Sequence, residues 1–355
     1  MTIRRFVTLL FVIALLAYVV VAISSLRPLV QTPALATEGC HLVSADGLIG
    51  AEDMEFDHQT GTLYIAAANR RSTGTFRPDP GAIFRWHPDD EAAPTKLPLQ
   101  GMGEALRPHG IGFFIHPSGE RRLFAVHHSP RGESVAIFRL DQEPGRQWLT
   151  LVRTVQAPHF VSINDVAASG LESFYVTNDH SRKPPWGHVL EDFAMLSTGS
   201  LVYFDGTSAR AVASGLRYAN GVQLSANQKQ VLVAETTGYR IKIFARQDNG
   251  DLTQLGVTNL QTTPDNFSID DHGDVLIGAH PSPFRFLRHA KSAASHAPSE
   301  VVQIKLSAEG AVLSNKTVFS DPGDRLSASS VAVAHGSHLV IGGVFDRGVL
   351  HCPRR

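Results

Sequence analysis

The sequence lacks the features of a strongly charged, disordered or disulfide-rich protein. Among 355 residues there are only two cysteines, 18% are charged, and 32 Lys and Arg nearly balance 33 Asp and Glu for a net charge of -1. A nucleic-acid partner requires a basic face, so this balance argues against a nucleic-acid role. With few charges and 43% hydrophobic residues, the chain has the composition of a folded globular protein.

Several catalytic motifs are also absent. No Gly-x-Ser-x-Gly nucleophile elbow occurs, which argues against covalent serine chemistry. No glycine-rich phosphate loop is present, which argues against nucleotide binding. The chain also has no Cys/His spacing of the kind that marks a zinc site.

The one long apolar run extends from Phe6 to Ile23 and follows two arginines. At about 1.5 Å per residue, a helix over this run is about 27 Å long, close to the ~30 Å of a bilayer core. The leading arginines favour a cytoplasmic N-terminus. We therefore expect residues 1–25 to form a transmembrane signal anchor, residues 26–39 a linker, and the remainder to lie on the periplasmic or secreted side. A signal peptide cleaved near Ala36 is the alternative, with the same destination.

The two cysteines are Cys40 and Cys352, near the two ends of the part expected to be exported. In an oxidising compartment, an isolated pair of this kind favours a disulfide. A bridge closing so long a loop would stabilise the fold by about 5 kcal/mol in the chain-entropy account. Two unrelated buried thiols are the alternative.

From residue 40 onward, short β-branched or aromatic runs recur between Gly, Asp, Asn and Pro, the pattern of strands and turns. Short helices are expected only within 182–199 and 284–297. The runs form six pairs: 62–65 with 82–84, 123–126 with 135–138, 174–176 with 201–204, 231–233 with 241–244, 275–277 with 301–304, and 339–341 with 349–350. Their spacing is at or slightly above the period of propeller blades. We therefore predict an all-β fold, a six-bladed β-propeller over residues 40–355, rather than a β-sandwich or two all-β domains.

Acidic and amide side chains precede four of these units, as Glu52-Asp53, Asn164-Asp165, Asn220-Gly221 and Asp265-Asn266. In each case the pair stands where the innermost strand of a blade would enter the central channel. Residues distant in sequence would then converge on one axis. Carboxylate and amide oxygens suit Ca²⁺, which takes about six to eight oxygen ligands. The same residue types are common in turns, so composition and spacing leave both interpretations open.

Two histidines, His109 and His128, flank the second unit. Beside a metal-activated ester, a histidine can act as a general base because its ordinary pKa of about 6.5 lets it accept a proton near neutrality. The chain contains 17 histidines, so a structural role is equally open to each of them.

Taken in order, these motifs resemble those of the paraoxonase/arylesterase family. The segments that carry the resemblance are Gly50-Ala51-Glu52-Asp53-Met54-Glu55, Pro108-His109-Gly110-Ile111, Asn164-Asp165, Phe174-Tyr175-Val176-Thr177-Asn178-Asp179-His180, Ala219-Asn220-Gly221, Asp265-Asn266 and Leu339 to Cys352. Each is short, but their joint order over the range from Cys40 to Cys352 is specific. The segment 181–199 diverges most, so the family's membrane- or lipoprotein-contacting surface is not carried over to it.

The resemblance implies a propeller with two Ca²⁺ ions in its tunnel that hydrolyses lactones and aryl esters. It assigns the catalytic ion to Glu52, Asn164, Asn220, Asp265 and Asn266, and a structural ion to Asp53, Asp165 and the carbonyl of Ile111. A gluconolactonase-like sugar lactonase and a non-catalytic propeller that binds a protein or glycan are the alternatives.

The resemblance also assigns residues outside the metal sites. It makes His109 and His128 a catalytic dyad, with Asp265 as an alternative base or nucleophile, and it pairs Cys40 with Cys352 in a disulfide. The same resemblance places Asp179, His180 and Tyr218 in the substrate pocket. Tyr218 stands where the family has a Phe, which leaves activity toward organophosphates open.

Overall fold

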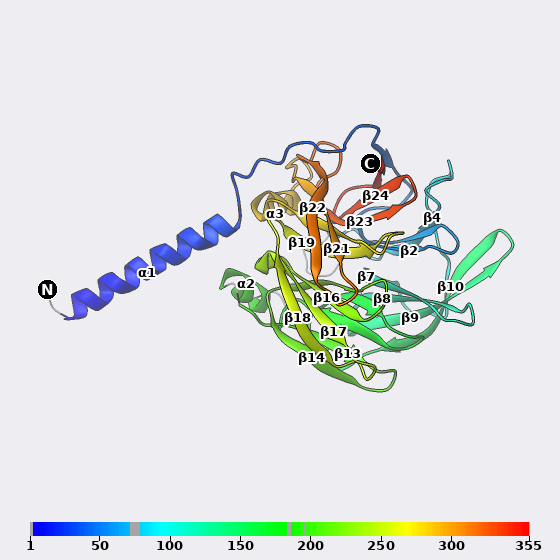
Figure 1. Ribbon diagram of the computed structural model, residues 1–355, viewed down its shortest axis with the longest axis horizontal. Helices are drawn as coiled ribbons and strands as arrows, with labels where there is room; N and C mark the ends of the chain where they lie inside the picture. Colours follow the sequence, from blue (N-terminus) through cyan, green and yellow to red (C-terminus); the bar gives the residue numbers. More distant parts are fainter. Residues whose placement is uncertain (1–2, 72–78, 183–185, 195, 355) are drawn as a thin grey trace.

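The computed structural model describes residues 3–71, 79–182, 186–194 and 196–354. In this part of the chain, six β-sheets surround a common axis, and a single helix, α1 (Ile3–Ser25), extends away from them (Figure 1). Five of the sheets have four strands and one has five. The predicted six-bladed all-β propeller is confirmed.

The innermost strand of each blade faces the tunnel, and contacts between successive inner strands close the ring. In chain order these strands are β2 (Ala51–Asp57), β7 (Pro108–Ile115), β11 (Ile163–Ala168), β15 (Ala219–Leu224), β19 (Thr263–Ile269) and β23 (Ser329–His335). All of them except β7 are buried at nearly every position, including the polar ones, because neighbouring inner strands cover them on both sides.

The six predicted strand pairs form the second and third strands of the blades. They are β3 (Thr62–Ala67) with β4 (Ala82–Trp86), β8 (Arg121–Ser129) with β9 (Gly132–Glu143), β12 (Phe174–Asn178) with β13 (Gly199–Phe204), β16 (Gln230–Glu235) with β17 (Arg240–Arg246), β20 (Val275–His280) with β21 (Ser299–Leu306), and β24 (His338–Gly343) with β25 (Val349–Pro353). All six pairs are antiparallel.

An outer strand completes each of the first five blades: β5 (Thr95–Lys96), β10 (Arg146–Val155), β14 (Ala209–Leu216), β18 (Leu252–Asn259) and β22 (Val312–Asp321). In the second blade, β6 (Leu99–Gln100) adds a fifth strand parallel to β10. No repeat in the sequence indicates β6, because two residues are too few to form a pattern.

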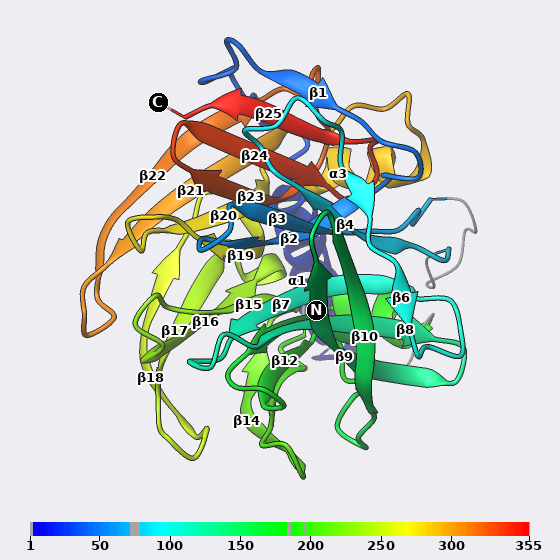
Figure 2. The ribbon, with the colours of Figure 1, turned by 90° about the vertical axis from the view of Figure 1, so that its right-hand side faces the viewer.

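The last blade is completed by the beginning of the propeller sequence. Strand β1 (His41–Val43) pairs antiparallel with β25 (Figure 2). Immediately before β1, Cys40 forms a disulfide with Cys352 across a sequence separation of 312 residues. The predicted disulfide is confirmed, and the alternative of two unrelated thiols is wrong.

Apolar side chains fill the spaces between blades and fix the inner strands in position. Between the second and third blades, the ring of Phe174 packs 5.8 Å from that of Phe124 and 5.2 Å from that of Phe204. Phe174 is fully buried. Truncating such a residue to alanine typically costs about 3–5 kcal/mol, so these interblade contacts are what holds the tunnel side chains in register.

Helices occur where the sequence allowed them. The chain forms α2 (Trp186–Phe193), within the first expected segment, and α3 (Pro283–Lys291), which begins one residue before the second. It also forms the short 3₁₀ turn η1 (Thr236–Gly238). Helix α3 starts at Ser282, whose hydroxyl accepts the amide of Arg285 at 3.3 Å, and a proline follows the cap, as is typical of helix starts.

The N-terminal helix forms, but no helix in the described residues is both long and apolar enough to cross a membrane. The expected transmembrane anchor is therefore not supported. The following segment is packed against the propeller rather than free. Leu35 forms a β-bridge with Ser320, the Ser320 hydroxyl donates to the carbonyl of Pro33 at 2.6 Å, and the carbonyl of Leu26 accepts the amide of Phe284 in α3.

Candidate metal and catalytic centre

The predicted ligands lie at or near the beginnings of four inner strands, at one end of the tunnel. Glu52, Asn164, Asn220, Asp265 and Asn266 are all buried there. The strands approach each other closely because a glycine sits at the narrowest point. A Cβ atom at Gly221 would lie 2.4 Å from the backbone oxygen of Asp265.

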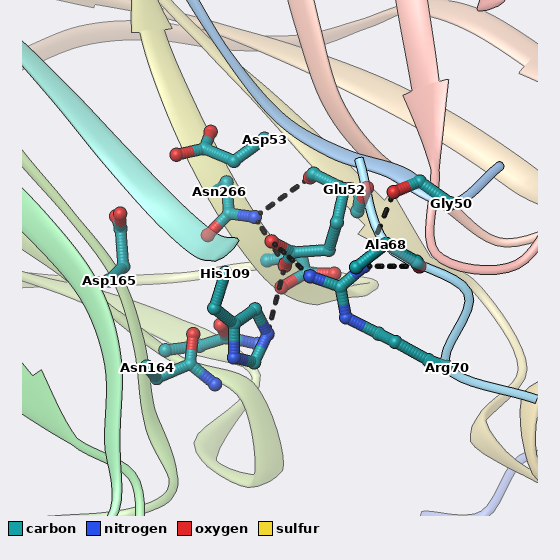
Figure 3. A network of polar contacts seen from close by, with 12 residues as sticks. Gly50, Glu52, Asp53, Ala68, Arg70, His109, Asn164, Asp165 and Asn266 are labelled. Atoms are coloured by element: carbon teal, nitrogen blue, oxygen red, sulfur yellow. Dashed lines mark hydrogen bonds and ion pairs between the residues drawn. The ribbon is translucent and has the colours of Figure 1, made fainter. Parts of the chain in front are cut away.

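A polar network connects Glu52 to its neighbours, and Figure 3 shows Asn266, His109 and Arg70 turned toward it. The amide nitrogen of Asn266 donates to Glu52 Oε1 at 2.8 Å, and His109 Nε2 lies 3.5 Å from the same oxygen. Arg70 lies 3.7 Å from Glu52 Oε2. Burial opposes ionisation of Glu52, but its contacts with His109, Arg70 and Asn266 outweigh it and hold its pKa at about 2. Glu52 is therefore a carboxylate at neutral pH.

Four oxygens in this cluster are buried and accept no hydrogen bond from the described part of the chain. They are Glu52 Oε2, Asn164 Oδ1, Asn220 Oδ1 and Asn266 Oδ1. A buried oxygen left unpartnered costs about 1–3 kcal/mol, and native proteins rarely tolerate such atoms without a ligand or ion.

The amide nitrogens of the same asparagines are all engaged. Asn164 donates to Asp179 at 3.3 Å, Asn220 to Thr236 at 3.1 Å, and Asn266 to Glu52. These bonds fix the orientation of each amide, and its oxygen is left without a hydrogen bond among the described residues. Oxygens from four strands form the type of donor set that Ca²⁺ prefers, so the residues fit the ion implied by the sequence.

Asp265 contributes a further carboxylate, held by His280. The Nε2 of His280 lies 2.8 Å from Asp265 Oδ2. Burial raises the pKa of Asp265, and its contact with His280 opposes that rise, while the charge of Glu52 adds to it. Glu52 and Asp265 thus interact electrostatically across the tunnel. A cation between such groups would relieve this repulsion.

A second pair of carboxyls, Asp53 and Asp165, follows the first group along β2 and β11. Asp53 accepts the amide of Ile111 at 2.6 Å, and Asp165 accepts the amide of Val222 at 2.7 Å. Burial raises the pKa values of both groups well above the ordinary range, and their negative neighbours add to the effect. The structure brings Ile111 to this pair through its amide, so a ligand role for its carbonyl stays a prediction. Gly110 allows the approach, because a Cβ there would lie 2.1 Å from Asp165 Oδ1.

The two predicted histidines are in direct contact. His109 Nδ1 lies 2.8 Å from His128 Nε2, and His128 Nδ1 lies 2.6 Å from Glu133 Oε2. A carboxylate only accepts, so His128 carries its proton on Nδ1. When both rings are neutral, its Nε2 accepts from His109 Nδ1–H, and the proton-free nitrogen of His109 is then Nε2, on the side of Glu52.

The predicted pocket residues adjoin the Asn164 side of the centre. Asp179 accepts from Ser162 at 2.5 Å and from His180 at 2.8 Å, and the ring of Tyr218 lies edge-on to His180 at 5.0 Å. Burial lowers the pKa of His180, but its two carboxylate partners, Asp179 and Asp192, outweigh this and raise it to about 10. Burial raises the pKa of Tyr218 well above its ordinary range. At this position a charged pair therefore lies beside a neutral phenol.

Several residues of the centre were not predicted. Arg70, Glu133 and His280 each contact a predicted residue but occur outside any repeated motif. His188 of α2 stacks on His180 with ring centroids 3.8 Å apart, in the segment that diverges most from the family pattern. The position of His280, at the end of the strand that pairs with β19, is the one signal that could have indicated a partner for Asp265.

Comparisons with known proteins agree with the geometry. The chain is 33% identical to bovine serum paraoxonase/arylesterase 2 over 324 residues, 88% of each chain. It is 32% identical to human serum paraoxonase/lactonase 3 over 326 residues, 89% of this chain and 88% of the relative.

Solved structures share the fold at low sequence identity. A luciferin-regenerating enzyme superposes with a TM-score of 0.53 and 14% identity, covering 89% of this chain and 95% of its own. A putative gluconolactonase superposes with a TM-score of 0.51 and 15% identity, covering 91% and 98%. Such distant similarity shows the propeller architecture alone. Residues 49–353 match the arylesterase family, and this chain therefore belongs to that family.

Proposed function

We propose that this protein is a calcium-dependent hydrolase of lactones and aryl esters. The observation that carries the proposal is the set of four buried oxygens from four strands that accept no hydrogen bond within the described chain, beside the His109–His128–Glu133 relay. The names of the bovine and human relatives, paraoxonase, arylesterase and lactonase, support the same reaction class.

In this proposal Glu52, Asn164, Asn220, Asp265 and Asn266 hold a catalytic Ca²⁺. Asp53, Asp165 and the carbonyl of Ile111 hold a second, structural ion. The catalytic ion supplies a Lewis acid that polarises an ester carbonyl and stabilises negative charge on its oxygen.

His109 is the proposed general base. Its Nε2 faces the centre. In the neutral form of the two rings Glu133 fixes the tautomer of His128, and His128 fixes that of His109, so that Nε2 is the nitrogen that can accept a proton. A water molecule beside His109 loses a proton to Nε2 as its oxygen attacks the ester carbonyl, and the same proton is available for the leaving oxygen. Proton transfer of this kind contributes about 10²–10⁴-fold to a rate.

Asp265 is the alternative base or nucleophile. Its carboxyl is buried, and its contact with His280 favours the ionised form. The two routes differ in one measurable respect. Substituting His109 removes the first and leaves the second intact.

Substrate selection falls to Asp179, His180 and Tyr218 in this proposal. The Tyr218 hydroxyl is held in its neutral form, so it offers a hydrogen-bond donor where the family pattern has a phenylalanine. Tyr218 also adopts a left-handed backbone conformation with φ of 52°, a strained state that persists where the surroundings enforce it. We expect this residue to favour substrates with a polar group next to the ester.

The test is turnover of a substrate panel by the full-length protein, with and without added Ca²⁺. The panel contains lactones of several ring and side-chain lengths, phenyl acetate, a sugar lactone and an organophosphate triester. We expect Ca²⁺-dependent hydrolysis of simple lactones and phenyl acetate. Turnover of the sugar lactone alone would indicate a gluconolactonase-like activity. If no substrate is hydrolysed, the remaining alternative is a non-catalytic propeller that binds a partner.

We also propose that the propeller works outside the cytoplasm. The Cys40–Cys352 disulfide supports this location, because disulfides persist in oxidising compartments. Attachment to a membrane through residues 1–25 stays a prediction. Fractionation of cells expressing the full chain, compared with a chain beginning at Ala36, tests it, because only the full chain should sediment with membranes.

A further inference from the structure

A second cluster of ligand-type side chains lies at the opposite end of the tunnel. Inner strands β2, β19 and β23 begin at or near the calcium-type oxygens and end about 20 Å away, at ~3.3 Å per residue. Just after or at those ends stand His58, Asp271 and His335, each from a different blade. One ligand atom of each lies within 4.8 Å of the others.

Both histidines contact the same oxygen of Asp271. His335 Nδ1 lies 2.7 Å from Asp271 Oδ1, and His58 Nδ1 lies 3.2 Å from that atom. The other oxygen of Asp271 is engaged elsewhere, since it accepts the amide of Gly336 at 2.7 Å. That bond fixes the carboxylate so that Oδ1 is directed toward the two imidazoles.

The tautomer of His58 makes this contact unusual. His58 Nε2 lies 3.2 Å from the carbonyl of Ile269, and a carbonyl can only accept, so Nε2 carries the proton. In a neutral imidazole, Nδ1 then presents a lone pair to a carboxylate oxygen. Two lone pairs in contact require a positive charge between them. A ring nitrogen bound to a backbone carbonyl is also the arrangement that orients histidines in metal sites.

The surroundings hold the two rings in place and leave the cluster open to solvent. Phe56 packs against both, with ring centroids 5.0 Å from His58 and 4.4 Å from His335. The side chains of His58, His335 and Asp271 are 42%, 31% and 25% exposed, so an ion can enter and keep water as a further ligand.

The local charge is compatible with a cation. Arg354 forms an ion pair with Asp270 and lies 3.7 Å from the second oxygen of Asp271. Two carboxylates therefore face one guanidinium, which leaves a net negative charge at the cluster.

From this geometry we infer that His58, Asp271 and His335 form a surface site for a divalent transition ion such as Zn²⁺, separate from the calcium centre. Two imidazole nitrogens and one carboxylate oxygen are the donors that Zn²⁺ takes in open tetrahedral sites, whereas Ca²⁺ prefers oxygen alone. The site joins the first, fifth and sixth blades, next to the point where the ring closes. Sequence spacing gave no sign of a zinc site, because the three residues are far apart in the chain.

The test is titration of the untagged full-length protein with Zn²⁺ by calorimetry, in excess Ca²⁺ so that the tunnel oxygens are occupied. The variants are His58→Gln and His335→Gln. Another histidine, His116, lies outside the cluster, so His116→Gln is the matched control. We expect Zn²⁺ to bind the wild type and the control equally, and affinity to fall about tenfold or more in each cluster variant. Mg²⁺ should not bind the cluster.

A second measurement does not depend on variants folding. Co²⁺ added to the wild type should give the visible absorption of a tetrahedral nitrogen and oxygen site, and Zn²⁺ should abolish it. Equal Zn²⁺ affinity in wild type, His58→Gln and His335→Gln would overturn the inference. So would the absence of both Zn²⁺ binding and a Co²⁺ spectrum, which would leave a protonated imidazole as the charge in the cluster.

Discussion

The two ends of the tunnel are built from the same inner strands but differ in burial and donor type. At one end, Glu52, Asn220 and Asp265 are buried and offer only oxygens. At the other end, His58 and His335 are partly exposed and offer nitrogens around one carboxylate. The strands are similar in length and packing, so the difference lies in the residues at their two termini.

The comparison indicates what an ion contributes at each end. Buried carboxyls and unpartnered oxygens are costly without a cation, so the fold itself should depend on Ca²⁺. Exposed imidazoles are solvated when no ion is bound, so the stability of the fold should not depend on an ion at the opposite end. Under the two proposals, an ion at the first end serves both stability and catalysis, and an ion at the second end is not needed for either.

The largest expected effect is the loss of activity in Asp265→Asn. This change removes a negative charge from the buried centre, and we expect lactone turnover to fall by about 10²–10³-fold or more. At the exposed end, Asp271→Asn makes the same chemical change and should leave turnover unaltered. Steady-state kinetics of the two variants measure this difference. Similar losses of turnover in both would contradict the assignment of catalysis to the buried end.

Next in size is the effect of His109→Gln. If His109 is the base, kcat should fall by about 10²-fold, with the melting temperature unchanged. Undiminished lactonase activity would assign the base to Asp265 instead. His335→Gln is the control, because it removes an imidazole from the other end of the tunnel.

Removal of Ca²⁺ should lower stability. An ion present at about 1,000 times its dissociation constant stabilises the native state by about 4 kcal/mol, which corresponds to a melting shift on the order of 10 °C for a domain of this size. Differential scanning calorimetry with and without EDTA measures it. The His58→Gln variant should lose as much as the wild type, since its end of the tunnel holds no calcium ligand. A melting temperature unaffected by EDTA would contradict the structural role of the ion.

The parts of the fold and of the site that repeat or carry a motif could be predicted from the sequence. The six strand pairs follow from alternating apolar runs, and Glu52, Asn164 and Asp265 were found because short motifs precede those runs. Each belongs to a different blade, so their convergence required the fold to be known first.

Residues that act through a single contact were not predictable. Glu133 lies on the strand after His128, and His280 lies on the neighbour of β19; neither has a distinguishing pattern. In the cluster of His58, Asp271 and His335, the first residue lies more than 200 positions before the other two. Such contacts depend on the ring closing, which no local pattern encodes.

The smallest predicted effect concerns a further imidazole cluster, in the sixth blade. His351 Nε2 lies 2.8 Å from His338 Nδ1, and its ring packs against Trp86. Burial, together with the positive charges of His338 and His41, lowers the pKa of His351 to about 4. Unlike His58, it has no carboxylate directly facing it among the described contacts. We therefore expect it to respond to acid rather than to a metal.

The sign of that response follows from the lowered pKa. Neutral His351 stabilises the fold fully above its unfolded pKa of 6.5, and this contribution is lost as the pH falls toward 4. The melting temperature of the wild type should therefore decline more steeply over this range than that of His351→Gln, by on the order of 2 °C because the ring is partly exposed. His116→Gln should follow the wild type. Parallel curves of melting temperature against pH for the wild type and His351→Gln would show that acid acts elsewhere. Loss of Zn²⁺ binding in His351→Gln would place the metal at this cluster instead of the tunnel end.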